Sequence, residues 1–157
     1  MTREELLLLD LPALGKLCRT DTYRGTGPGG QKRNKTESAV RVTHLESGLS
    51  AFADETRSQH TNKEHALEKL RLQLAVKLRQ EPQVWTGGCP ALSNHRYALW
   101  LGVVFDALQA EDFKIAPAAA FLGLSTNQLV KQLSRDPFAC QQINQERLAR
   151  QLPPLRW

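Results

Sequence analysis

The sequence predicts an α+β protein in two parts: a small domain of antiparallel strands with a packed helix and a glycine-rich loop, followed by an all-helical module. Three observations indicate this fold class. Residues 37–53 alternate between apolar and polar side chains, as half-buried strands do. Four glycines and one proline stand in the seven residues after Arg24, a density that regular structure does not tolerate. Beyond residue 96, apolar side chains recur at helical spacing. The expected parts are the first domain over 1–84, a linker over 85–95 and the helical module over 96–157.

The composition of the 157 residues is that of a folded, soluble protein, with 41% hydrophobic and 24% charged residues. No apolar run reaches the ~18–20 residues that a membrane span needs, and acidic residues flank the N-terminal leucines. We therefore expect a cytoplasmic protein with neither a membrane segment nor a targeting peptide. The three cysteines are odd in number and widely spaced, which predicts reduced thiols rather than disulfides or a zinc site.

The N-terminal segment combines helical spacing with a helix breaker. Leucines recur over residues 3–18 with a roughly helical period, but Pro12 interrupts them, which predicts one or two short helical turns. The segment from Arg24 to Gln31 then follows as a loop with exposed amides, because its glycines and proline cannot keep a regular backbone.

The next segment predicts an antiparallel hairpin. Over 37–45 the side chains alternate, so that Val40 and Val42 share one face and the polar residues between and beside them share the other. Glu46-Ser47-Gly48 supplies the turn, and 49–53 continues as the second strand.

A long helix is expected after the hairpin. Thr61 and Glu64 are spaced as a capping box, in which the hydroxyl and the carboxylate each bond a free amide of the first turn. We expect the helix to end near Glu81-Pro82, because proline disfavours helical backbone at the residue before it. One apolar stripe follows the cap at helical spacing: Ala66, Leu67, Leu70, Leu74 and Leu78.

The helical module is expected to hold helices over 96–111, 115–122, 126–134 and 137–151. The apolar residues of its first helix predict a core: Leu99, Trp100, Val103, Phe105 and Leu108.

A helix-turn-helix pattern lies inside this module. Ala119, Gly123 and Leu129 have the required spacing, with a small residue for close approach, a glycine for the turn and an apolar residue behind it. Ser125 is the expected N-cap of the second helix. Because that helix has Lys131 as its single cation, we expect the module to dock on rRNA or on the first domain rather than to read DNA bases.

The positive charge is concentrated in one short segment. The net charge is +5, and the segment from Arg24 to Arg41 holds five cations against Glu37 alone. A local basic patch indicates a polyanionic partner, most often nucleic acid, although a solvated charged face is an equally common explanation.

Several short motifs stand at fixed spacing between residues 24 and 73. They are Gly27-Pro28-Gly29-Gly30-Gln31, Asn34-Lys35, Ser38-Ala39-Val40-Arg41-Val42-Thr43-His44, Ser47-Gly48, Arg57-Ser58-Gln59, and Asn62-Lys63 with Ala66. A lone Gly-Gly-Gln recurs by chance, whereas the combination is specific. In it the chain resembles the Gly-Gly-Gln catalytic domain of class-I peptide chain release factors, in the short, codon-independent form of their ribosome-rescue relatives.

The resemblance implies hydrolysis of the ester that joins a nascent peptide to tRNA, in the peptidyl-transferase centre of the ribosome. Gln31 is then the catalytic residue, with its backbone amide as donor to the developing oxyanion or leaving 3′-hydroxyl, and Gly29 and Gly30 give it conformational support. The loop has no Ser, Cys or His nucleophile, so a positioned water would attack. The implied partners are the ribosome and peptidyl-tRNA. Whether a glutamine methyltransferase modifies Gln31 stays open.

The same resemblance implies a task for the surrounding polar residues, which is to contact rRNA phosphates without reading sequence. Arg57-Ser58-Gln59 has a second explanation of equal weight, a helix-entry cap. His44 lies on the strand pattern and is expected to make a local hydrogen bond rather than to transfer protons. We assign no metal and no cofactor, and nothing demands more than a monomer. The expected rRNA contacts are Arg24, Lys32, Arg33, Lys35, Arg41, Arg57 and Gln59.

Two features depart from the family pattern. Lys32 follows Gln31, where a small or aromatic polar residue is more common. In addition, few residues precede the loop and no long Lys/Arg tail ends the chain. We therefore expect no codon-reading domain, and the way in which ribosomes are selected stays open.

The competing hypothesis is a nucleic-acid-binding module without hydrolytic activity, which would use the basic patch and the helix-turn-helix. The intact Gly-Gly-Gln argues against it, because a glycine loop that only binds phosphate can end in any residue. The sequence therefore favours ribosome-dependent, codon-independent hydrolysis of peptidyl-tRNA, as in ribosome rescue.

Overall fold

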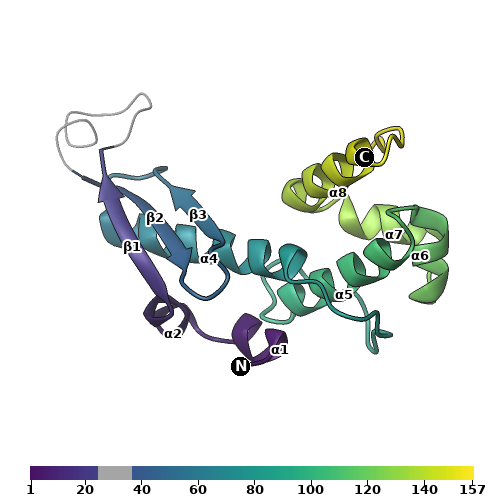
Figure 1. Cartoon of the computed structure of the whole chain (residues 1–157), viewed down its shortest axis with the longest axis horizontal. Helices are drawn as coiled ribbons and strands as arrows, with labels where there is room; N and C mark the ends of the chain where they lie inside the picture. The colour runs from purple at the N-terminus through teal and green to yellow at the C-terminus, as the bar shows by residue number, and fades with distance from the viewer. Residues whose placement is uncertain (25–36) are drawn as a thin grey trace. The chain divides into compact units, whose positions relative to one another are not determined.

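The computed structural model of the chain describes residues 1–24 and 37–157. These form two compact units, Met1–Leu74 (unit 1) and Ala75–Trp157 (unit 2). The predicted mixed fold class is confirmed: a three-stranded antiparallel sheet lies in unit 1, and the described residues of unit 2 form helices and loops (Figure 1). The predicted boundaries, with a first domain over 1–84 and a linker over 85–95, stay a prediction.

The sheet of unit 1 has the strand order β1-β2-β3, with β1 at Cys18–Tyr23, β2 at Ala39–His44 and β3 at Ser50–Ala53. Strands β2 and β3 are the predicted hairpin. Strand β1 was not predicted, because its sequence Cys-Arg-Thr-Asp-Thr-Tyr lacks apolar alternation. It is a strand because it pairs with β2 over its whole length, from Cys18 opposite His44 to Tyr23 opposite Ala39.

Two short helices precede the sheet, as expected: α1 (Arg3–Leu7) and α2 (Leu11–Lys16). Pro12 does not end a helix here. It stands in the first turn of α2, where its missing N–H removes no helical hydrogen bond. Asp10 caps α2, since its Oδ1 accepts the amide of Ala13 at 2.8 Å.

Helix α4 (Gln59–Lys77) begins and ends earlier than predicted. The capping box at Thr61 and Glu64 is wrong: Thr61 lies inside the helix, and its amide donates to Ser58 Oγ at 3.1 Å. Because the helix ends at Lys77, Leu78 lies beyond it and is only half-buried.

The early end of α4 has a local cause within unit 2. The Arg79 guanidinium donates to the Val76 carbonyl at 2.6 Å, and the Gln80 amide donates to Asp106 Oδ1 at 3.1 Å. These side chains supply hydrogen-bond partners that a further helical turn would otherwise provide. Pro82 therefore limits how far the helix could reach and does not decide where it stops.

The core of unit 1 lies between the sheet and α4, which runs along one face of the sheet (Figure 1). Val40 and Val42 are fully buried while Arg41 between them is exposed, which confirms the predicted faces of β2. The other four members of the predicted helical stripe are also buried, namely Ala66, Leu67, Leu70 and Leu74.

Unit 2 holds the four predicted helices, each within two residues of its expected bounds. They are α5 (Tyr97–Ala110), α6 (Ile115–Phe121), α7 (Thr126–Leu133) and α8 (Pro137–Ala149). The predicted core of α5 is partly wrong, because Leu99 and Val103 are only half-buried. The side of α5 that carries Trp100, Leu101, Val104, Phe105 and Leu108 faces the core instead, at spacings of three and four residues.

The helix-turn-helix shape of α6 and α7 is confirmed. Ala119 and Leu129 are fully buried, and Gly123 takes φ +74°, a conformation that favours glycine. Ser125 caps α7 in a capping box: its Oγ accepts the Gln128 amide at 3.1 Å, and its own amide donates to Gln128 Oε1 at 2.8 Å. Among the described residues, no helix has the length and apolar character that crossing a membrane requires.

Candidate functional site

The residues predicted to be catalytic, Gly29, Gly30 and Gln31, fall in the segment 25–36, which lies outside the described residues. Three of the predicted rRNA contacts lie in the same segment, namely Lys32, Arg33 and Lys35. This segment joins the end of β1 to the start of β2, which lie opposite each other at Tyr23 and Ala39. We call residues 22–24 and 37–38 the loop stem. The described part of the candidate site is this stem and the start of α4 beside it.

Asn62 is the most completely bonded side chain at the stem, and it is fully buried. Its Nδ2 donates to the Ser38 carbonyl at 2.8 Å and to the Thr56 carbonyl at 2.9 Å. Its Oδ1 accepts the Thr56 amide at 3.0 Å and lies 2.9 Å from the Thr56 hydroxyl. Two carbonyls on one side and an N–H on the other match the amide in a single orientation. Asn62 thus ties the stem and the segment before α4 to the first turn of the helix.

Gln59 makes a second tie from the same helix. Its Nε2 donates to the Glu37 carbonyl at 2.7 Å. The Glu37 carboxylate in turn accepts the Thr22 hydroxyl at 3.2 Å, across the stem. Through Glu37, the start of α4 is therefore linked to both sides of the stem.

The motif Arg57-Ser58-Gln59 includes a helix cap, as its structural explanation predicted. Ser58 Oγ accepts the Thr61 amide, and the Ser58 amide donates to Thr56 Oγ1 at 3.1 Å. Arg57 is exposed. The three motif residues thus differ: Ser58 caps α4, Gln59 binds the stem, and Arg57 points its charge to solvent.

The described rRNA-contact predictions lie at the surface. Arg24, Arg41 and Arg57 are all exposed. Arg41 lies 5.7 Å from the centroid of the Phe52 ring, and that ring stacks on Tyr23 at a centroid distance of 5.2 Å. An arginine fixed over an aromatic pair presents a positive charge on the face of the sheet that does not carry Val40 and Val42.

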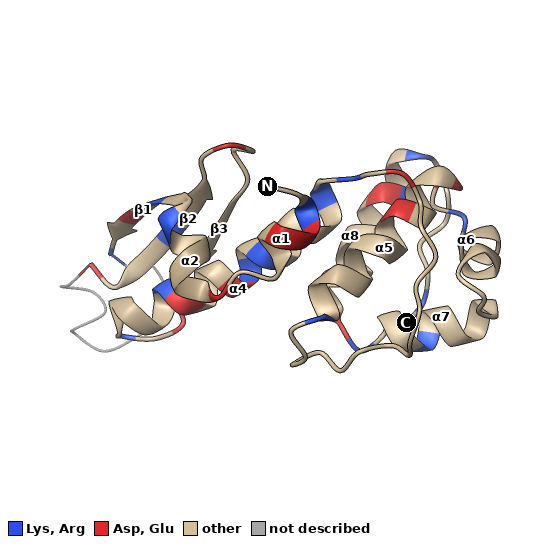
Figure 2. Cartoon of the chain, turned by 90° about the horizontal axis from the view of Figure 1, so that it is seen from below, with Lys and Arg blue, Asp and Glu red and all other residues tan. Residues whose placement is uncertain are grey.

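Elsewhere on unit 1 the charges are mixed, since Lys and Arg share β1 and α4 with Asp and Glu (Figure 2). Arg19 pairs with Asp21 at 3.1 Å, and Lys69 pairs with Glu55. Burial alone would raise the pKa of Glu55, but the hydrogen bond and charge of Lys69 outweigh it and lower the pKa. These cations are paired with acidic side chains within unit 1.

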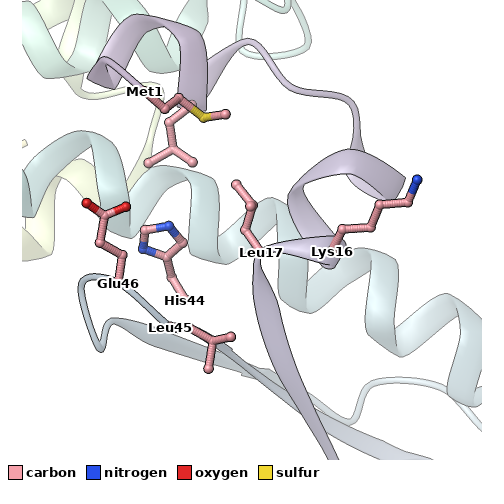
Figure 3. Close-up of a pocket in the computed structure, with 7 residues that line it drawn as sticks. Met1, Lys16, Leu17, His44, Leu45 and Glu46 are labelled. Atoms are coloured by element: carbon pink, nitrogen blue, oxygen red, sulfur yellow. The ribbon is translucent and has the colours of Figure 1, made fainter.

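His44 lies at the end of β2 away from the stem, and its role is the predicted local one. Its Nδ1 lies 2.7 Å from Ser47 Oγ, and the ring is buried. A cavity of about 250 Å³ adjoins it, lined also by Met1, Leu17 and Leu45 (Figure 3). Five residue steps at ~3.3 Å each separate Ala39 from His44, roughly 17 Å. The cavity is therefore remote from the stem.

The thiols offer no activated nucleophile. All three cysteines are free, as predicted. Burial raises the pKa of Cys18, Cys89 and Cys140. Positive charges nearby oppose this rise in pKa only in part at Cys18 and Cys89, and the negative charge of Asp136 adds to it at Cys140. Within the described ranges, no three His, Cys, Asp or Glu side chains gather closely enough to hold a metal ion.

The sequence alone does not reveal the task of Asn62, although the motif that contains it is visible there. One signal pointed to it: Gln59 and Asn62 are three residues apart, a spacing that puts both on one face of a helix. What they bind could not be inferred, because their acceptors lie 22 and 24 residues earlier in the chain.

Part of the chain that includes this region is similar to known proteins. Residues 15–85 match the RF-1 domain family. The chain is 57% identical over 63 residues to peptide chain release factor 1 of Leptothrix cholodnii, 51% over 63 residues to that of Acetivibrio thermocellus, and 54% over 65 residues to that of Methylibium petroleiphilum. Each alignment covers 40% or 41% of this chain and 18% of the relative, so the shared part spans about a fifth of those proteins. Residues 15–85 of this chain are therefore similar to the RF-1 domain, which peptide chain release factors contain.

Proposed function

We propose that this chain hydrolyses the ester bond of peptidyl-tRNA on the ribosome. The observation that carries the proposal is the match of residues 15–85 to the RF-1 domain family, because that region contains Gly27-Pro28-Gly29-Gly30-Gln31 between β1 and β2. The similar proteins are named peptide chain release factors, and releasing a peptide from tRNA is ester hydrolysis. The Gln31 main-chain amide would stabilise the developing negative charge, and its side chain would orient water and exclude larger nucleophiles.

The cations around the loop are proposed to hold it against rRNA. Phosphate contacts fix the depth and orientation of a bound segment without reading sequence. Arg24, Arg41 and Arg57 are exposed and suited to this task. Lys32, Arg33 and Lys35 are proposed to act in the same way from the segment 25–36.

Release is proposed to be independent of the codon and to depend on the state of the ribosome, as in rescue. The RF-1 domain match ends at residue 85, and residues 86–157 lie outside it. In unit 2, helix α7 has Lys131 as its single cation, which favours docking over base readout.

Peptide release from ribosomes stalled on an mRNA truncated at the P site tests this proposal. The wild type should release the peptide, and Gln31→Pro, which removes the proposed N–H donor, should slow release at least ~100-fold. Gln31→Ala keeps the N–H and should still lower the rate through the lost side chain, whereas Gln73→Ala on α4 is a matched control and should not. Full activity of both Gln31 variants would contradict the assignment. The same assay on isolated large subunits would identify the ribosomal state.

A second candidate, a DNA- or RNA-binding module without hydrolysis, is favoured by one observation, the helix-turn-helix of α6 and α7 with its buried Ala119 and capped α7. Co-sedimentation with ribosomes separates the two candidates. Binding to duplex DNA without any association with ribosomes would support the second.

A further inference from the structure

We infer that Gln59 and Asn62 are positioning residues for this hydrolysis: they hold the main chain at Glu37 and Ser38 and thereby set where the catalytic loop leaves the sheet. The inference rests on the proposed function, since it assigns these residues a task in the same reaction. It also replaces the expected rRNA contact of Gln59 with an intramolecular one.

The geometry of Asn62 indicates positioning rather than packing alone. The side chain is fully buried, and each of its amide atoms has a protein partner at 2.8 to 3.0 Å. Leaving a buried amide without a hydrogen-bond partner costs free energy. The bond from Asn62 Nδ2 to the Ser38 carbonyl is therefore strongly favoured. The stem backbone at this point cannot shift without breaking that bond.

Gln59 extends the hold by one residue toward the loop. Its amide donates to the Glu37 carbonyl at 2.7 Å, although the side chain is exposed and could bond to water instead. Glu37 then accepts the Thr22 hydroxyl, which belongs to the opposite side of the stem. Consecutive carbonyls at 37 and 38 are thus bound by two residues of one helical turn, and both ends of the loop follow the position of α4.

Such a hold matters because catalysis by positioned groups depends steeply on geometry. A displacement of about 1 Å at a reacting group can cost on the order of a hundredfold in rate. A stem that is fixed by hydrogen bonds to a helix transmits its position to the residues that follow it, so loss of one bond should slow the chemical step and leave binding to the ribosome unchanged.

Gln59→Glu tests this with Gln73→Glu as its matched control. Both changes replace an amide by a carboxylate on α4, so both variants have the same net charge. The two sites are 14 residues apart, about 21 Å along the helix. Only Gln59→Glu removes the donor to the Glu37 carbonyl.

The measurement is the ribosome-concentration dependence of peptide release. Relative to Gln73→Glu, we expect Gln59→Glu to lower the maximal rate about tenfold and to leave the half-saturating ribosome concentration within about twofold. A raised half-saturating concentration with an unchanged maximal rate would show an rRNA contact and overturn the inference. Identical behaviour of the two variants would overturn it as well.

Amide hydrogen exchange of the free chain gives a readout that does not depend on activity. The amides of Ala39 and Val40 should exchange at least about fivefold faster in Gln59→Glu and not in Gln73→Glu. If the wild type releases no peptide from any ribosomal substrate, the proposed function fails. Faster exchange would then still support the hold on the stem, and unchanged exchange would overturn it.

Discussion

The arginines near the loop stem of unit 1 differ from a group of arginines in unit 2. In unit 1, Arg24, Arg41 and Arg57 are exposed. In unit 2, several guanidinium groups are engaged with the unit's own atoms. Arg147 is buried and donates to the carbonyls of Phe113 at 2.7 Å and Pro153 at 2.9 Å.

A cluster around Phe113 makes the same point. Arg79 and Arg150 lie 5.2 Å and 4.6 Å from the centroid of its ring, and both pair with Glu146. Arg135 donates to the Pro90 carbonyl at 3.1 Å and contacts Cys89 Sγ. A guanidinium that is buried or paired with a carboxylate within its own unit is less available to a phosphate. The comparison teaches that a count of cations does not locate a nucleic-acid surface, whereas the exposure and the partners of those cations do.

The largest expected effect contrasts two asparagines that bind main chain, Asn62 in unit 1 and Asn144 in unit 2. Asn62 is fully buried, whereas Asn144 is half-buried and holds the amide and the carbonyl of Leu155. Asn62→Ala should lower the free energy of unfolding by about 3 kcal/mol, because it strands buried carbonyls, and Asn144→Ala by about 1 kcal/mol. Urea denaturation followed by circular dichroism measures both. Equal losses would show that the stem is no more constrained than the C-terminal segment.

A smaller effect is expected from the ion-pair cluster of unit 2. Burial alone would raise the pKa of Glu146, but the hydrogen bond from Arg150 and the charge of Arg79 outweigh it and lower the pKa from its ordinary value of 4.5. A lowered pKa in the folded state gives stability that is complete above pH 4.5 and is lost as the pH falls through the folded-state value.

Glu146→Gln should therefore cost about 1 kcal/mol of unfolding free energy at pH 7 and progressively less as the pH falls below 4.5. Thermal or urea unfolding over this pH range checks the prediction. A difference between the variant and the wild type that does not vary with pH would mean that Glu146 acts through packing and not through its charge.

The smallest effect sharpens the contrast between exposed and engaged arginines. Arg57→Gln should weaken ribosome binding about threefold and reduce the slope of log K against log salt by about 1, with little change in stability. Arg135→Gln should leave both the affinity and the slope unchanged, since its guanidinium is used within unit 2. Co-sedimentation with ribosomes at several salt concentrations measures both. A reduced slope for Arg135→Gln would show that Arg135 also contacts the ribosome, which would contradict the contrast between Arg57 and Arg135.

The helices of unit 2 were predictable from the sequence because their signals are local. Ser125 and Asp136 cap α7 and α8, and Gly123 makes the turn before α7, all within a few residues of the helix ends. The start of α4 was not predictable in this way, since Ser58 and Thr61 are both good capping residues. The earlier start places Gln59 in the same helical turn as Asn62, and both side chains bind the stem from there.

Strand β1 and the hold on the stem show where prediction from the sequence ends. The polar segment 18–23 has no periodic signal of its own, and its strand conformation depends on pairing with β2, about 20 residues later. The motif Arg57-Ser58-Gln59 was visible in the sequence. Its division into an exposed cation, a helix cap and a stem ligand was not.

The sequence by itself determined the composition of the loop with Gln31, the buried and exposed faces of β2, and the capped helices of unit 2. Each depends on residue identity or on a period of two to four residues, which the chain expresses locally. The tertiary structure decided that β2 pairs with β1 as well as with β3. It also decided which carbonyls Gln59 and Asn62 bind. Those carbonyls lie 22 and 24 residues away along the chain, and only the packing of α4 beside the sheet brings donor and acceptor within hydrogen-bond distance.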